Sequence, residues 1–149
     1  MNRLVITMGD PCGVGPEIIV KFFDGIYKVE DKRLFLVVVG SKSVLEYYKK
    51  KLRIDLEIVE ITKAHIVDGK LENGKLHLIN IDTDIDKLEF GKHTELGGAL
   101  SIKYLDKAIE LCHGKYVDGI VTCPISKDSI NMAGFKYSGH TEYLAEKSK

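Results

Sequence analysis

The sequence has no excess of charge of either sign. Lysine plus arginine and aspartate plus glutamate each number 22, so the formal net charge is zero. A chain without a net field offers no general electrostatic attraction to nucleic acid or to an anionic membrane. The basic cluster at residues 49–51 is then interpreted as the solvated end of a helix. We therefore expect neither nucleic acid nor a membrane as a partner.

Long apolar runs and paired cysteines are lacking as well. The longest apolar runs are far too short to cross a bilayer, and the chain starts directly in a strand-like segment with no leader pattern. The three cysteines, Cys12, Cys112 and Cys123, are far apart and form no C-x-x-C pair. Such usage is typical of reduced thiols. We expect a soluble, cytoplasmic protein.

What the chain does contain is an alternation of strand and helix patterns. The apolar run at 34–39 is continuous, as in a central parallel strand, whereas 56–61 alternates like a half-exposed one. The patterns predict strands at 3–7, 34–39, 56–61, 76–81 and 116–122, the last of them buried, and helices at 16–24, from Ser41 as N-cap to 51, at 95–112, from 126 to Gly134 and after 139–142. Residues 62–91 look least helical, and the helix at 95–112 shows one apolar face that includes Gly98, Ile102, Leu105, Ile109 and Cys112.

This order predicts an α/β fold with a mostly parallel sheet that helices cover on both faces. The 149 residues, 44% of them hydrophobic, suffice for one domain or for one lobe of a larger protein. The chain stops at Lys149 inside a helix pattern, with nothing that resembles a C-cap. We therefore expect residues 1–149 to be the N-terminal part of a longer protein, and no internal domain boundary is predicted.

A glycine-rich turn at residues 7–17, Thr-Met-Gly-Asp-Pro-Cys-Gly-Val-Gly-Pro-Glu, separates the first predicted strand from the first predicted helix. It matches neither the G-x-G-x-x-G fingerprint nor a Walker A loop. Asp10 and Glu17 would both repel a phosphate. The turn is either a tight connection or part of a site at the carboxyl end of the sheet, and both interpretations stay open.

A second unusual segment follows the predicted strand at 116–122. It runs Thr-Cys-Pro-Ile-Ser-Lys from Thr122 to Lys127, and Gly-His-Thr-Glu follows at 139–142. Because carboxyl ends of parallel strands share one edge of a sheet, we expect these segments to converge with the glycine-rich turn. His140 is the strongest single candidate for acid–base chemistry or ligand binding, although a surface or capping histidine would look the same. Lys127 is either a phosphate ligand or an exposed helix lysine.

The remaining candidates favour structural roles. Cys12 and Cys123 have no sequence neighbour that would lower a thiol pKa, so we interpret them as buried thiols. His93 begins a tripeptide, His-Thr-Glu, that repeats at His140, but it lacks the preceding glycine and is interpreted as a helix flank. His65, His77 and His113 show no metal-ligand spacing, and the aspartates at 82, 84 and 86 lack the glycine and glutamate of a calcium loop.

Three motifs occur in one order: T-M-G-D-P-x-G-x-G-P-E at 7–17, V-T-x-P-I-x-K at 121–127 and G-H-T-E-Y-L-A at 139–145. Together they resemble the N-terminal half of the 4-hydroxythreonine-4-phosphate dehydrogenases, enzymes of pyridoxal phosphate biosynthesis. The resemblance covers essentially the whole chain. Cys12 and Cys123 stand where small residues, often alanine, are usual in that family.

The resemblance implies a two-lobed fold like that of the isocitrate and isopropylmalate dehydrogenases. It implies oxidation and decarboxylation of 4-phosphooxy-L-threonine, a small phosphorylated hydroxy-amino acid, to 3-amino-2-oxopropyl phosphate. The implied cofactors are NAD (or NADP) and a divalent metal such as zinc, magnesium or cobalt. His140 and Thr141 would contact the substrate, the ligand histidines for the metal would lie beyond Lys149, and no catalytic residue is assigned within this chain. A homodimer is implied for the complete protein.

Two alternatives stay open. One is a related dehydrogenase of another four-carbon hydroxy-acid phosphate, such as a threonate or erythronate phosphate. The other is a non-catalytic domain that binds a phosphorylated metabolite or a partner subunit, since the downstream ligands of the family are absent from these 149 residues.

Overall fold

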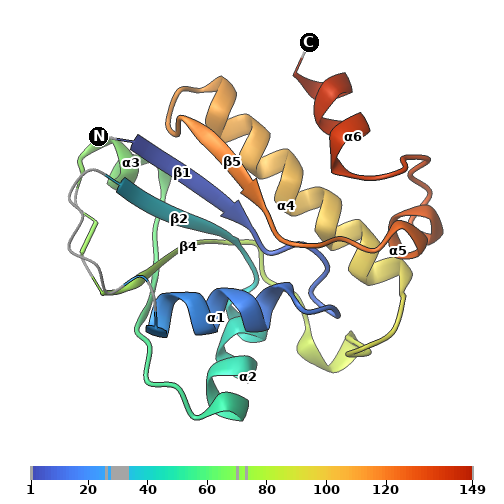
Figure 1. Cartoon of the computed structure of the whole chain (residues 1–149), viewed down its shortest axis with the longest axis horizontal. Coiled ribbons are helices and arrows are strands. Elements are labelled where there is room, and N and C mark those ends of the chain that lie inside the picture. Colours follow the sequence, from blue (N-terminus) through green and yellow to red (C-terminus); the bar gives the residue numbers. More distant parts are fainter. Residues whose placement is uncertain (1, 26, 28–33, 70, 73, 149) are drawn as a thin grey trace.

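The protein is described from a computed structural model that covers residues 2–25, 27, 34–69, 71–72 and 74–148. Within these ranges one sheet of parallel strands has the order β3-β4-β2-β1-β5 (Figure 1). The strands are β1 (Asn2–Thr7), β2 (Leu34–Gly40), β3 (Ile58–Glu60), β4 (Leu76–Asn80) and β5 (Gly119–Thr122). The helices are α1 (Gly15–Gly25), α2 (Lys42–Leu52), α3 (Lys63–Val67), α4 (Glu95–His113), α5 (Lys127–Met132) and α6 (His140–Lys147), with a 3₁₀ turn η1 (Ile85–Lys87).

The centre of the sheet is β2, as the continuous apolar run at 34–39 predicts. Val37 pairs with Val5 of β1 on one side and with His77 of β4 on the other. The three valines at 37–39 are fully buried, because a central strand of a parallel sheet has a helical layer on each face.

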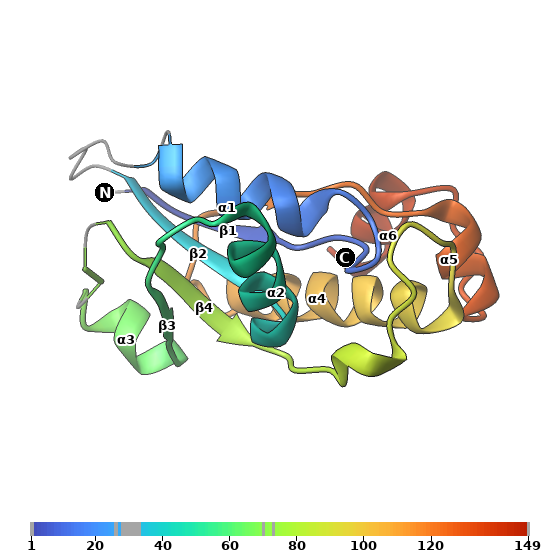
Figure 2. The same ribbon diagram turned by 90° about the horizontal axis from the view of Figure 1, so that it is seen from below.

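Helices cover both faces of the sheet, which confirms the predicted α/β class. Figure 2 shows α1 on one face and α4 on the opposite face, and α2 packs against α1. The connection from β1 to β2 passes through α1, whereas the return from β4 to β5 passes through α4. The direction of strand addition therefore reverses between β1 and β5, and a crevice forms outside the carboxyl ends of the strands at such a reversal.

Helix α4 is buried along two stripes rather than along the single predicted face. Leu100, Tyr104 and Leu111 pack into the main core with the sheet. The predicted stripe of Ile102, Leu105 and Ile109 instead packs against α5 and α6, where Ile130 and Tyr143 complete a second apolar cluster. The long helix therefore joins the sheet to the C-terminal helices.

Several details of the sequence interpretation were wrong, among them the start of the last helix, since α6 begins at His140 within the predicted loop at 139–142. Strand β5 begins at Gly119 and is an edge strand of the sheet, so Val121 is 45% exposed instead of buried. The region at 62–91, predicted to be the least helical, contains the short helix α3. A capping box between Thr62 and His65 stabilises the start of this helix. At α2 the N-cap position of Ser41 is confirmed, but its hydroxyl does not cap the helix. The Ser41 Oγ instead donates to Asp82 Oδ1 at 3.2 Å and lies 2.9 Å from Ser43 Oγ. In the ranges described, no helix has the length and apolar character needed to cross a membrane.

Candidate functional site

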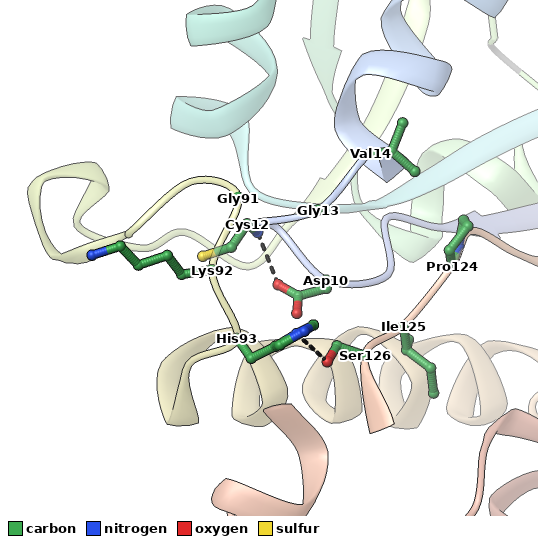
Figure 3. Close-up of a pocket in the computed structure, with 10 residues that line it drawn as sticks. All are labelled: Asp10, Cys12, Gly13, Val14, Gly91, Lys92, His93, Pro124, Ile125 and Ser126. Carbon is green, nitrogen blue, oxygen red and sulfur yellow. Dashed lines mark hydrogen bonds between the residues drawn. The ribbon is translucent and has the colours of Figure 1, made fainter. Parts of the chain in front are cut away.

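The loops that follow β1 and β5 converge, as predicted, and enclose a crevice of about 280 Å³. Gly9 makes the approach possible: its φ is +72°, and a Cβ there would lie 2.2 Å from the carbonyl oxygen of Pro124. The Asp10 backbone N–H donates to that same oxygen at 3.1 Å. The crevice is lined by Asp10, Cys12, Gly13, Val14, Gly91, Lys92, His93, Pro124, Ile125 and Ser126 (Figure 3).

Asp10 lies at the base of this crevice and is only 4% exposed. Its Oδ1 accepts a hydrogen bond from the Cys12 backbone N–H at 2.9 Å, which shapes the glycine-rich turn as an Asx turn. The carboxylate also lies against the first turn of α4, where a Cβ on Gly97 would come within 2.6 Å of Oδ1. The positive end of this long helix stabilises a negative charge at that place.

His93 enters the crevice from the loop before α4. Its Nδ1 lies 2.7 Å from Ser126 Oγ, and its Nε2 lies 3.8 Å from Asp128 Oδ2. Ser126 caps α5, since its Oγ accepts the backbone N–H of Ser129 at 3.1 Å. The interpretation of His93 as a helix flank is confirmed, since His93 directly precedes Thr94, the N-cap of α4, but it did not predict that His93 also lines the crevice. The one available signal was the tripeptide that His93 shares with His140.

The loop that carries His93 is fastened on two sides. The Gly91 backbone N–H donates to the Cys12 carbonyl at 2.8 Å, and the Phe90 ring stacks on Tyr47 of α2 at a centroid distance of 4.5 Å. Lys92 pairs with Glu89 at 2.6 Å, which raises the pKa of its ammonium, and Figure 3 shows its side chain directed away from the crevice. The lysine therefore lines the rim without placing its charge inside.

The predicted ligand residues at 140 and 141 begin α6 and do not line this crevice. The His140 ring is half-buried and hydrogen-bonds to the backbone of Cys123, and burial lowers the pKa of this imidazole. Its Nε2 is buried without a hydrogen-bond partner within the described residues. Thr141 is exposed, and so is Lys127. The structure thus places His93 in the lining of this crevice, whereas His140 lies against Cys123 on the loop that follows β5.

The three cysteines form no disulfide bonds. Cys12 and Cys123 are buried, and burial raises the pKa of both thiols, that of Cys123 to about 11. A thiol with such a pKa stays protonated near neutral pH and is a poor nucleophile. This agrees with their interpretation as buried thiols.

The part of the chain covered by the structure holds no group of three or more histidine, cysteine, aspartate or glutamate side chains that could bind a metal ion. Of the three alternating aspartates, Asp84 instead caps η1 by accepting the Asp86 backbone N–H. The predicted loop character holds for Asp82 and Asp84, whereas Asp86 lies within η1.

Comparison with known proteins identifies the family. Residues 32–149 match the family described as pyridoxal phosphate biosynthetic protein PdxA, and the chain belongs to it. A Sulfurihydrogenibium protein named 4-hydroxythreonine-4-phosphate dehydrogenase is 40% identical over 148 residues, which are 99% of this chain and 43% of the relative. A Fusobacterium nucleatum protein whose provisional name is D-threonate 4-phosphate dehydrogenase has the same identity and coverage.

Solved structures agree. The crystal structure of a 4-hydroxythreonine-4-phosphate dehydrogenase from Burkholderia phymatum superimposes with a TM-score of 0.86 at 30% identity, over 99% of this chain and 44% of the other. The chain thus spans less than half the length of the relatives that it matches. The resemblance seen in the three sequence motifs is confirmed, as is the α/β class that it implied.

Proposed function

We propose that this chain is part of an NAD-dependent dehydrogenase that oxidises 4-phosphooxy-L-threonine and releases 3-amino-2-oxopropyl phosphate after decarboxylation. The observation that carries the proposal is the match to the PdxA family over residues 32–149, together with a relative named as such a dehydrogenase at 40% identity. The crevice between the carboxyl ends of β1 and β5 supports it, since α/β enzymes bind their ligands at such a reversal.

In this proposal His140 and Thr141 contact the substrate. Burial lowers the pKa of His140, so its imidazole is neutral near neutral pH. A neutral ring offers one nitrogen as a donor and the other as an acceptor, and Nε2 is the atom that has no partner within the described residues. This nitrogen can form a hydrogen bond with a substrate hydroxyl when the ring turns toward the substrate.

NAD would accept the hydride, and a divalent metal such as zinc, magnesium or cobalt is proposed as a second cofactor. The described residues offer no ligand set for the metal, so no step of the reaction is derived from it. We also propose a cytoplasmic homodimer for the full-length protein, and measurement of its mass in solution tests the dimer.

The direct test is turnover by the full-length protein isolated from its native source, after its intact mass has been compared with the 16.7 kDa of this chain. NADH should form when phosphorylated hydroxythreonine, NAD and a divalent metal are supplied. His140→Asn should lower kcat/KM by about tenfold or more, because it removes a substrate contact. Absence of NADH formation by a verified, folded full-length protein would refute the proposal.

A second candidate substrate is D-threonate 4-phosphate, favoured by the Fusobacterium nucleatum relative that is equally similar to this chain. The two substrates differ in the group at C2, an ammonium in one and a hydroxyl in the other. Measurement of kcat/KM for both with the same preparation decides between them.

A non-catalytic role in binding a phosphorylated metabolite is a further candidate function. Titration calorimetry with each phosphorylated hydroxy acid tests it, and a bound ligand should also raise the unfolding temperature. Binding without turnover would favour this role over the dehydrogenase.

A further inference from the structure

Helix α6 is short and depends on packing for its position. It has eight residues, and a helix of this length is marginal in water by itself. Its N-cap, Gly139, has no side chain that could bond the first backbone N–H groups. Tyr143 is the one buried side chain that α6 contributes within the described residues, and it is 3% exposed. The place of the whole helix therefore depends on the contacts of Tyr143.

Tyr143 holds α6 on α4 in two ways (Figure 1). Its ring packs in the second apolar cluster, together with Ile102, Leu105 and Ile130. Its hydroxyl donates a hydrogen bond to Asp106 Oδ1 of α4. Burial and this bond raise the pKa of the hydroxyl, so it stays protonated and remains a donor near neutral pH. Because the acceptor is a carboxylate, the bond is of the stronger, charge-assisted kind.

The other side-chain hydrogen bonds of this segment are local. Tyr137 donates to Glu146 Oε2 at 2.9 Å, and the Ser138 backbone N–H donates to Glu142 Oε2 at 2.9 Å. Both bonds join α6 to the loop directly before it, so neither fixes the helix on the rest of the fold. In the part of the chain that the structure describes, the tyrosine–aspartate bond is the one that joins a side chain of α6 to a side chain of α4.

His140 and Tyr143 lie on the same side of α6, because residues three apart in a helix are neighbours. The half-buried His140 ring bonds to the backbone of Cys123. We propose that Tyr143 and Asp106 are positioning residues that hold His140 at the loop after β5, where its Nε2 can reach the substrate. The inference rests on the proposed function, in which His140 contacts the substrate. It adds that α4 sets the place of this contact through Asp106.

The variant Tyr143→Phe, made in the full-length protein, keeps the ring and removes the bond to Asp106. We expect KM for phosphorylated hydroxythreonine to rise about threefold to tenfold, because a hydrogen bond that places the substrate contact is lost. KM for NAD should stay unchanged, since His140 is assigned to the other substrate. A smaller fraction of folded protein would instead lower the rate and leave both KM values as they are.

The matched control is Tyr137→Phe. It removes the same kind of bond, from a tyrosine hydroxyl to a glutamate, but that bond stays within the local segment. This variant should leave both KM values unchanged.

Two variants of Asp106 decide the matter if Tyr143→Phe does not fold. Asp106 is exposed, so its substitution disturbs no buried packing. Asp106→Ala removes the acceptor and should raise KM for phosphorylated hydroxythreonine as Tyr143→Phe does. Asp106→Asn keeps an oxygen that accepts the tyrosine hydroxyl, so KM should stay within about twofold of its original value.

A second readout needs no turnover. NMR of the histidine rings in the full-length protein follows the titration of His140, whose pKa burial lowers. In Tyr143→Phe and Asp106→Ala a less firmly held α6 exposes this ring, so its pKa should rise toward the ordinary value of 6.5. Hydrogen exchange of the α6 amides, measured by mass spectrometry, should become faster in the same variants. Tyr137→Phe should change neither.

The inference is overturned if Tyr143→Phe and Asp106→Ala leave KM for phosphorylated hydroxythreonine and the His140 titration unchanged. It is also overturned if the two KM values rise together, or if Tyr137→Phe has the same effect. A shifted His140 titration in a full-length protein that forms no NADH would support the positioning of His140 and contradict the proposed function. An unchanged titration with full turnover would contradict the positioning and leave the proposed function standing.

Discussion

Gly98 is the point at which α4 and α5 approach each other most tightly, and its substitution by alanine tests how the site is supported. A Cβ at this position would lie 1.9 Å from the carbonyl oxygen of Ser129 and 2.6 Å from the backbone nitrogen of Ile130. Both of those residues are fully buried, so α5 cannot yield by turning toward solvent. The helix must instead move away from α4 as a unit.

Two opposing terms set the size of the effect. Alanine within a helix is favoured over glycine by about 0.5–1 kcal/mol. Overpacking of a buried contact costs about 1–3 kcal/mol, and the clash here is with backbone atoms that have no other rotamer. We expect Gly98→Ala to lower the free energy of unfolding by about 1–2 kcal/mol, which for a chain of this length lowers the melting temperature by about 2–8 °C.

The assay is thermal and urea unfolding followed by circular dichroism, with Gly25→Ala as the control. Gly25 also belongs to a helix, at its last turn, but a Cβ there has nothing within 4 Å, so this variant should be neutral or slightly more stable. Because Ser126 begins α5, the displacement should also lengthen its contact with His93 and change the NMR signals of that ring. A Gly98→Ala variant as stable as the control, with an unchanged His93 signal, would refute the proposed tight packing.

Three further results are expected. Burial lowers the pKa of His77, so the ring is neutral in the folded chain but takes up a proton when the chain unfolds below pH 6.5. Its contribution to the free energy of unfolding is therefore complete above this pH and is lost as the pH falls. We expect His77→Gln to make the melting temperature less dependent on pH between about 7.5 and 5. Phe90→Leu removes a stacked ring, which should cost about 0.5–1.5 kcal/mol in urea unfolding and speed hydrogen exchange of the Gly91 amide; unchanged exchange would show that the stack does not hold the loop. Cys12 and Cys123 are buried and have raised pKa values, so we expect them to react with iodoacetamide only in denaturant near neutral pH. Mass spectrometry that finds either cysteine alkylated in the native chain would contradict their burial.

Local pattern predicted most of the elements because it reports how a segment is buried. The run at 34–39 has apolar side chains on both faces, and only a strand between two helical layers buries both. The convergence of the turn at 7–17 with the segment at 122–127 was predictable for a similar reason, since parallel strands end at one edge. The three ordered motifs were also enough to identify the family, because three long matches in one order rarely coincide by chance.

The wrong predictions concern segments whose burial depends on which other element packs against them. The stripe on α4 that contains Ile102 and Leu105 was recognised as apolar, but periodicity does not reveal whether such a stripe meets a sheet or another helix. Strand β5 looks buried by composition, yet it is an edge strand of this sheet and leaves Val121 half exposed. Neither fact is encoded within the segment itself.

The sequence by itself determined the alternation of strands and helices, the central position of β2 and the family. Only the tertiary structure decided the strand order β3-β4-β2-β1-β5 and the position of His93 in the crevice lining. His93 and Ser126 are 33 residues apart, and they meet because α4 crosses beneath the sheet and α5 packs on Gly98. Contacts of this range follow from the packing of whole elements, which no local pattern of side chains specifies.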